Sequence, residues 1–160
     1  MEAFFMQLAQ AGFAKELVVF ISSMFPIWEL KGAIILAQTW GIAPWTSFFL
    51  CYVGSTLAGL IVLFFLRPAM KWMYSRPRLS KLADWIQNRG VRKSDKVTRY
   101  ATWGLFFFVA VPLPTTGVWT GSLIATVLDM PLKKSIPAVV FGNVVAGLAI
   151  MLLYGVVTLI

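Results

Sequence analysis

The hydrophobic pattern of the chain consists of two long apolar runs and two interrupted ones. Residues 45–66 and 138–160 are each apolar over the ~20 residues that a helix needs to cross a hydrocarbon core. Two further apolar stretches, 16–43 and 100–132, are broken by prolines near their middle, and proline interrupts a helix. The pattern predicts two spanning helices and two segments that each form a pair of shorter helices. Proline suits a first helical turn, so we expect Pro137 to open the second span.

The composition agrees with a membrane protein. The 160 residues are 59% hydrophobic and their mean hydropathy is +0.81, whereas soluble domains average about 45–50% apolar residues. The chain has no histidine and one cysteine, Cys51, which lies within an apolar run. No nucleophile-elbow or phosphate-loop motif is present. We therefore expect an integral membrane protein that is not an enzyme and that needs no cofactor and no metal.

The positive charge is concentrated in one segment. The formal net charge is +8, and ten of the fourteen Lys and Arg residues lie within residues 67–99. A basic segment between apolar runs is typical of a cytoplasmic loop, and it favours contact with membrane lipids over nucleic acid. Within it, "LSKLADWIQNRG" (79–90) has apolar residues at helical spacing, which predicts an interfacial amphipathic helix.

The basic residues also set the expected topology. Arg67 follows the first span and Lys133-Lys134 precede the second, so the two spans should run in opposite directions with the C-terminus outside. The segment 100–132 has basic residues at both ends, which favours a re-entrant hairpin. If the segment 16–43 is built alike, it enters from the outer side. The alternative is an ordinary kinked span, which would change the topology.

Landmarks recur along the chain and predict an internal repeat. Their separations are nearly constant, at 86 residues for Pro26 and Pro112, 87 for Pro44 and Pro131, and 88 for "GSTLAG" (54–59) and "GNVVAG" (142–147). We expect the glycine pairs to form packing faces. Because the two spans are expected to run oppositely, the repeat should be inverted, an arrangement typical of secondary transporters.

The predicted fold is therefore a single all-α membrane domain, residues 1–160. It consists of an inverted repeat of two re-entrant helical hairpins, each followed by a transmembrane helix. Repeat 1 covers about 16–66, a cytoplasmic linker with the amphipathic helix covers 67–99, and repeat 2 covers 100–160.

The first interrupted segment, "FPIWELKGAI", carries two charged residues directly after its proline. Ionisable side chains inside a membrane usually face a cavity or a partner, and Glu29 and Lys31, two apart on a helix, are poorly placed to pair. We expect each to reach across to the other hairpin. Lys31 could then bind a phosphate or another anion, and Glu29 could accept a proton. The alternative is that both mark the hairpin mouth, with Lys31 extending to the interface.

The second interrupted segment, "VPLPTTGVWTG", offers hydroxyl groups and close backbone approach. Helix N-termini after such a break suit an anion, although a threonine can equally cap a helix. Trp119 could act as a lid or stacking surface. Asn143 matches Ser55 in the repeat and could equally be interhelical glue. The predicted site for substrate or proton coupling comprises Glu29, Lys31, Pro26, Pro112, Pro114, Thr115, Thr116, Trp119, Thr120 and Asn143.

These motifs resemble a known family. "FPIWELKGAIILA" and "FFFVAVPLPTTGVWTGSLIATVLDMPLKKS", joined by a basic segment, are similar to the small multidrug export proteins and, more distantly, to the DedA/VTT superfamily. The resemblance implies opposed re-entrant hairpins and, for the superfamily, movement of lipids such as polyprenyl phosphates, with proton coupling. Glu29 looks like the acidic residue of the first hairpin. The arginines usual in the second hairpin are absent from residues 111–117, which leaves Lys31 as the nearby cation.

Together these observations predict a multi-pass transporter or flippase of a prokaryotic inner membrane, plausibly a homodimer. Its substrate would be an amphipathic anion such as a lipid phosphate, with possible proton coupling. One alternative is efflux of hydrophobic cations, with Glu29 as the counter-ion. Another is a membrane scaffold that transports nothing and recruits partners through its basic helix.

Overall fold

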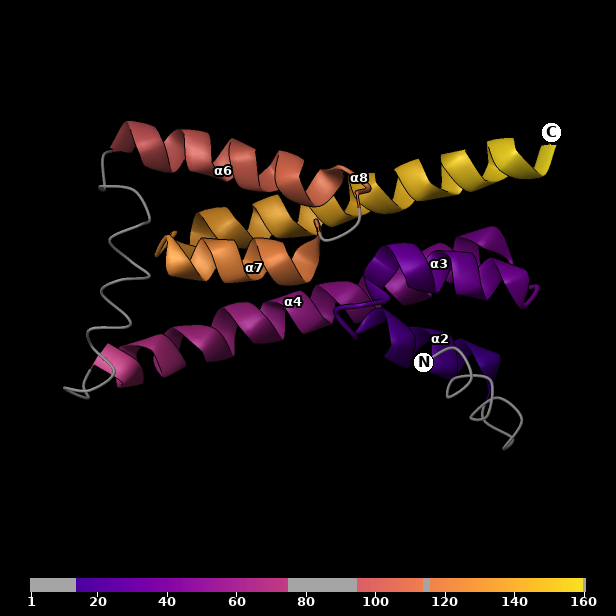
Figure 1. Ribbon diagram of the computed structural model, residues 1–160, viewed down its shortest axis with the longest axis horizontal. Helices are drawn as coiled ribbons and strands as arrows, with labels where there is room; N and C mark the ends of the chain where they lie inside the picture. The colour runs from indigo at the N-terminus through magenta and orange to yellow at the C-terminus, as the bar shows by residue number, and fades with distance from the viewer. Residues whose placement is uncertain (1–13, 75–94, 114–115, 160) are drawn as a thin grey trace.

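The computed structural model describes residues 14–74, 95–113 and 116–159, and within these ranges it contains six α-helices and no strand. This confirms the expected all-helical class. The helices, which Figure 1 shows from indigo to yellow along the chain, are α2 (Lys15–Ser23), α3 (Glu29–Thr39), α4 (Pro44–Tyr74), α6 (Asp95–Ala110), α7 (Val118–Val127) and α8 (Leu132–Leu159).

Two of these helices are long and apolar enough to cross a membrane. The qualifying stretches are Pro44–Ala69 in α4 and Leu132–Gly155 in α8, each with a mean hydropathy of 2.3. The two helices lie side by side and run in opposite directions (Figure 1). Large apolar side chains such as Phe65 and Leu152 are exposed on them. Such an exterior suits lipid rather than water.

Both long helices extend beyond the apolar runs that predicted them. Helix α4 continues past residue 66 to Tyr74. Helix α8 begins at Leu132, so the expectation that Pro137 opens it was wrong, and Pro137 lies inside the helix. The first turn forms directly after Pro131, whose carbonyl accepts bonds from the backbone N–H groups of Lys134 and Ser135, both at 2.9 Å. The two lysines therefore belong to the helix that they were expected to precede.

The two interrupted segments are pairs of shorter helices, as predicted. Helix α2 ends where the N–H groups of Met24 and Phe25 bond to Ile21 and Ser22, and Pro26 follows before α3 begins. Helix α6 ends at Ala110, just before Pro112, and α7 begins at Val118. The amphipathic helix expected at 79–90 lies outside the described residues.

The two halves of the chain, α2–α4 and α6–α8, make the same main contacts. Helix α4 packs on α2 and α3 of its own half and on α7 and α8 of the other. Helix α8 correspondingly packs on α6 and α7 and on α3 and α4. Each of these contacts has its counterpart when the halves are exchanged.

The ends of α3 and α7 also correspond. Gly41 and Asp129, 88 positions apart, both have positive φ, 76° and 48°. The N–H of the next residue bonds back over five positions in both halves, from Ile42 to Ala37 at 3.0 Å and from Met130 to Ala125 at 2.9 Å. This bond closes a left-handed helix cap. The same backbone device therefore turns the chain into α4 and α8.

Glycines on α4 and α8 allow close helix packing. A Cβ added to Gly54 would lie 2.7 Å from the carbonyl oxygen of Phe20 on α2. A Cβ added to Gly142 would lie 2.9 Å from that of Phe106 on α6. One added to Gly147 would lie 2.7 Å from the ring of Phe48. These approaches leave no room for a side chain, which confirms that the glycine pairs are packing faces.

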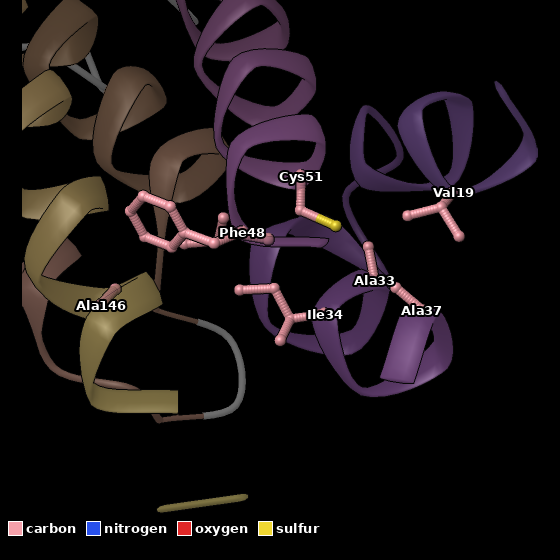
Figure 2. Packing of buried hydrophobic residues seen from close by; sticks show 8 residues of the cluster. Val19, Ala33, Ile34, Ala37, Phe48, Cys51 and Ala146 are labelled. Atoms are coloured by element: carbon pink, nitrogen blue, oxygen red, sulfur yellow. The ribbon is translucent and has the colours of Figure 1, made fainter. Parts of the chain in front are cut away.

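Two apolar clusters form the buried core, one centred on each half. The first joins α2, α3, α4 and α8, and Figure 2 shows Phe48 reaching from α4 toward Ala146 of α8. The second is its counterpart around α6 and α7. Its buried members are Leu63, Leu105, Val109, Val118, Ala125, Met130, Ala138 and Val139. The breaks in the two interrupted segments lie between these clusters and are held by polar contacts.

Candidate functional site

Glu29 opens α3 with an unusual backbone conformation. Its φ is 47°, a left-handed value that is uncommon for a residue with a side chain. Its backbone N–H donates to the carbonyl of Phe25 at 2.8 Å, across Pro26. Only 8% of the residue is exposed. The turn after Pro26 thus directs a carboxylate into the protein.

The carboxylate of Glu29 lies at the N-terminus of α7. The backbone N–H of Trp119 donates to its Oε1 at 3.1 Å. Gly117, the residue before α7, has a φ of 155°, and a Cβ added there would collide with the carboxylate. The first N–H groups of a helix lack partners within the helix and attract negative charge. Glu29 therefore occupies the anion position of α7.

Lys31 binds the segment that connects α6 and α7. Its Nζ donates to the carbonyl of Leu113 at 2.9 Å and to Thr116 Oγ1 at 3.1 Å, with a longer contact of 3.5 Å to the carbonyl of Val111. It also donates to the carbonyl of Thr116. Glu29 and Lys31 thus both reach the other half of the chain, as predicted. Lys31 is partly buried and these contacts fix it against the connecting segment; the alternative that it extends to the membrane interface stays a prediction.

Trp119 ties α7 to the first break. Its indole Nε1 donates to the carbonyl of Met24 at 2.9 Å, while its backbone N–H binds Glu29. These contacts fix the position of α7 relative to the end of α2. That Trp119 could also act as a lid or a stacking surface stays a prediction.

These groups surround a cavity of about 300 Å³ between the two breaks. Its lining residues are Pro26, Ile27, Trp28, Glu29, Lys31, Gly32, Ile35, Pro112, Leu113, Thr116, Trp119, Thr120 and Ile150. Seven of the ten predicted site residues are among them. The cavity lining contains one acidic and one basic side chain, together with hydroxyl groups and apolar surface.

Three predicted residues are not part of this cavity lining. Pro114 and Thr115 lie outside the described residues. Asn143 is 2% exposed and donates through Nδ2 to Ser55 Oγ at 2.8 Å and to Thr56 Oγ1 at 2.9 Å. It links α8 to α4 at positions 88 apart, which corresponds to its alternative interpretation as interhelical glue.

Two features of the site were missed by sequence reasoning. Lys31 was expected to bind an anion, yet its observed partners are backbone carbonyls and a threonine. Gly117 was noted only as a close-approach glycine, whereas it leaves the space that the Glu29 carboxylate fills. Glu29 and Gly117 are 88 residues apart, which is also the separation of the two glycine motifs. The internal repeat could therefore have indicated that these two positions correspond. No group of three or more metal-ligating side chains occurs within the part of the chain that the structure describes.

The fold and the cavity together define a small all-helical membrane protein with a charged interior site. Over residues 29–149 the chain matches the family described as "Putative small multi-drug export protein". The match covers most of the chain, so the protein belongs to this family, and the resemblance drawn from its motifs is confirmed. The more distant likeness to the DedA/VTT superfamily stays a prediction.

Neither the curated proteins nor the solved structures gave a match. Membership of an export family and the two long apolar helices together indicate a membrane protein. The matched range begins at Glu29 and includes α7 and most of α8.

Proposed function

We propose that the protein is a transporter of an amphipathic anion, of the lipid phosphate class, which passes through the cavity between the two breaks together with a proton carried by Glu29. The proposal is supported by the family, which is named for export, and by the charged cavity itself. The fold, the charge balance of the cavity and its exposed apolar rim each support a part of this proposal.

The finer fold that we propose is an inverted repeat of re-entrant hairpins. Helices α4 and α8 run in opposite directions and the halves make matching contacts. Pairs α2–α3 and α6–α7 would then each enter and leave the membrane on one side. Broken backbone at membrane depth is tolerated where it is buried or lines a cavity. Transporters built from such repeats hold their substrate between the broken helices, where this cavity lies.

The charge balance of the cavity favours an anionic substrate. Glu29 and Lys31 are the charged residues that line it, and with both ionised their charges cancel. A bound cation would leave one positive charge without a partner in a medium that solvates charge poorly. If Glu29 is protonated, the site carries one positive charge, which attracts an anion and offsets one of its negative charges. This balance is the observation that carries the proposal.

Protonation of Glu29 would also vacate a binding position for the anion. The carboxylate now accepts a bond from the first turn of α7. A neutral acid binds such N–H groups more weakly, and a phosphate oxygen would replace it at the helix N-terminus. Lys31 and Thr116 stand beside this position. Proton and anion would therefore be taken up together, and the return of the carboxylate to α7 would expel the anion.

The rim of the cavity supports a substrate with an apolar tail. Ile27, Leu113 and Ile35 line the cavity and are also exposed, by 71%, 56% and 44%. In a bilayer, such side chains face lipid. A head group could sit between the breaks while its chain remains among the lipid tails.

The first test measures transbilayer movement of a labelled polyprenyl phosphate in proteoliposomes, with an imposed proton gradient. We expect wild type to move the lipid and Glu29→Gln to lower the proton-driven rate at least tenfold. The amide can still accept a hydrogen bond from α7, but it cannot take up and release a proton. Glu16→Gln, an exposed carboxylate at the start of α2, is the matched control and should behave like wild type. Movement of a lipophilic cation instead of the lipid would contradict the anion proposal.

A second test concerns Lys31. We expect Lys31→Met to abolish lipid movement, because it removes the positive charge and the ammonium donor that three carbonyl groups share. A hydrogen bond to a charged group contributes about 1.5–3 kcal/mol, so the variant should also unfold more readily. Lys31→Arg, assayed alongside, retains the charge and donors and should keep part of the activity. If Lys31→Met moves the phosphate at the wild-type rate from a folded protein, Lys31 has no part in binding it.

A further inference from the structure

A second cavity lies at the end of the molecule where α3 turns into α4. Its volume is about 380 Å³ and it is lined by Gln38, Gly41, Ile42, Ala43, Pro44, Met151, Tyr154 and Gly155. It shares no lining residue with the cavity around Glu29, and the proposed function does not use it. What it would hold can be inferred from the other half of the chain.

The corresponding place in the second half is occupied by an arginine. The cap formed by Gly41 and Ile42 matches that of Asp129 and Met130, 88 positions further on. In the second half, the guanidinium of Arg67 reaches from α4 and donates to the carbonyl of Met130. The residue 88 positions after Arg67 is Gly155, on α8. In the first half a glycine stands in place of this arginine, and the carbonyls of the cap have other donors: Ser47 Oγ donates to that of Ile42 at 3.3 Å and Lys15 Nζ to that of Trp40 at 3.3 Å.

The space at Gly155 is open. A Cβ added to Gly155 or to Gly41 would meet no atom of the described residues within 4 Å. Around Gly142 and Gly147 on the same helix, by contrast, an added Cβ would lie within 3 Å of a neighbour. The glycine at 155 thus opens a space that corresponds in position to the one that Arg67 enters.

The groups around this space suit a cation. The last carbonyls of α3 give this end of the helix a partial negative charge. The carbonyl of Ile42 corresponds to the one that Arg67 binds. It lies 3.3 Å from Ser47 Oγ, and a carbonyl oxygen has two lone pairs, so it can accept a second donor. The lining also includes the amide of Gln38 and the ring of Tyr154, and an aromatic face attracts a cation.

We propose that this cavity is a second binding site, which takes a guanidinium or primary ammonium group carried by a small organic cation or by a lipid headgroup. The bound group would donate to the Ile42 carbonyl as Arg67 donates to that of Met130. The inference does not depend on the proposed transport of an anion.

The test uses n-propylguanidinium, which reproduces the arginine side chain, and its neutral isostere n-propylurea. We expect propylguanidinium to raise the thermal unfolding midpoint of the purified wild-type protein by a few degrees in a saturable manner, since a ligand that binds only the folded state stabilises it. Propylurea should have no such effect. Glu29→Gln should respond like wild type, which separates this site from the transport cavity.

Variants at Gly155 locate the effect. Gly155→Arg supplies the guanidinium from the chain itself and should abolish the response to the free cation. Gly155→Leu fills the space without donors and should abolish it too, which keeps the test informative if the arginine variant does not fold. A saturable response that persists in a folded Gly155 variant, or no saturable response in wild type, would overturn the proposal.

The two sources of the cation are separated in lipid nanodiscs. If a lipid headgroup is the ligand, discs in which phosphatidylethanolamine replaces phosphatidylcholine, at an unchanged fraction of phosphatidylglycerol, should raise the apparent dissociation constant of propylguanidinium several-fold. If a small cation is the ligand, the constant should be the same in both.

Discussion

At the scale of single residues, the contact of Glu29 with Gly117 combines a left-handed backbone with a close approach of the side chain. Glu29 holds a left-handed backbone conformation, with a φ of 47°, which costs a residue with a side chain roughly 1–2 kcal/mol. Gly117 must lack a side chain for the carboxylate to reach α7. Strain of this kind persists where surrounding contacts enforce it, and it is frequent at functional sites. Here the enforcing contacts are the bond from Trp119 and the bond across Pro26.

Gly117→Ala tests this encounter. The added methyl group would displace the carboxylate of Glu29 and would also strain a backbone whose φ is 155°. We expect a loss of about 1–3 kcal/mol in unfolding free energy and a loss of transport larger than that destabilisation explains. The measurements are denaturant unfolding in mixed micelles and the lipid movement assay.

The control for this prediction is Gly104→Ala. Gly104 lies on α6, and an added Cβ meets nothing within 4 Å among the described residues. Alanine in a helix interior is favoured over glycine by roughly 0.5–1 kcal/mol, so this variant should be as stable as wild type or slightly more so. Equal effects of the two substitutions would mean that the Glu29 contact is unimportant.

At the scale of helices, much of the fold could be predicted from the sequence and the ends of the helices could not. Runs of apolar residues revealed the two long helices, and prolines marked the breaks near residues 26 and 112. Pro137 misled because a helix that begins at Leu132 tolerates a proline beyond its first turn. Asp129 is not a glycine, yet it adopts the left-handed conformation that Gly41 has at the corresponding cap of the first half.

In the site, too, the charged residues could be predicted from the sequence, but their partners could not. Charged residues within an apolar stretch are conspicuous, and Glu29 and Lys31 were identified on that basis. Their partners are mostly backbone atoms, the carbonyls of Val111, Leu113 and Thr116 and the N–H of Trp119. Every residue has these atoms, so no residue type signals them, and only the folded chain shows which of them converge.

At this scale, the contribution to stability of the hydrogen bonds between α4 and α8 can be predicted. Asn143 donates to Ser55 and Thr56 at the centre of the helix crossing. Hydrogen bonds of this kind in membranes contribute about 0.6 kcal/mol on average and at most about 1.7 kcal/mol. We expect Asn143→Ala to lower the unfolding free energy by about 1 kcal/mol. A double-mutant cycle with Ser55→Ala should show a coupling of similar size.

Thr46→Ala, at an exposed position of α4, provides the reference for this cycle and should change stability little. Transport should survive in Asn143→Ala, because the residue is absent from the cavity lining. Loss of transport in a folded variant would show that the helix link is part of the transport mechanism rather than only of the fold.

At the scale of the whole molecule, the proposed inverted repeat predicts which parts of the chain face each side of the membrane. Cys51 is the only cysteine in the sequence and is fully buried. Cys51→Ala therefore gives a background in which single cysteines report their side. Glu16 and Lys133 are both exposed and stand at the ends of the two interrupted segments, so each decides one hairpin.

In intact cells, we expect an impermeant maleimide to label Glu16→Cys and to label Lys133→Cys only after the membrane is opened. We expect the basic segment 67–99 to lie on the cytoplasmic side because of its positive charge, and α4 would then carry the chain from the outside inward. If 16–43 re-enters, Glu16 lies outside with the start of α4, whereas a kinked span would put it inside. If 100–132 re-enters, Lys133 stays inside with the basic segment, whereas a kinked span would expose it outside. Labelling of either cysteine from the opposite side would therefore replace that hairpin by a span, and the two halves could no longer form an inverted repeat of re-entrant hairpins.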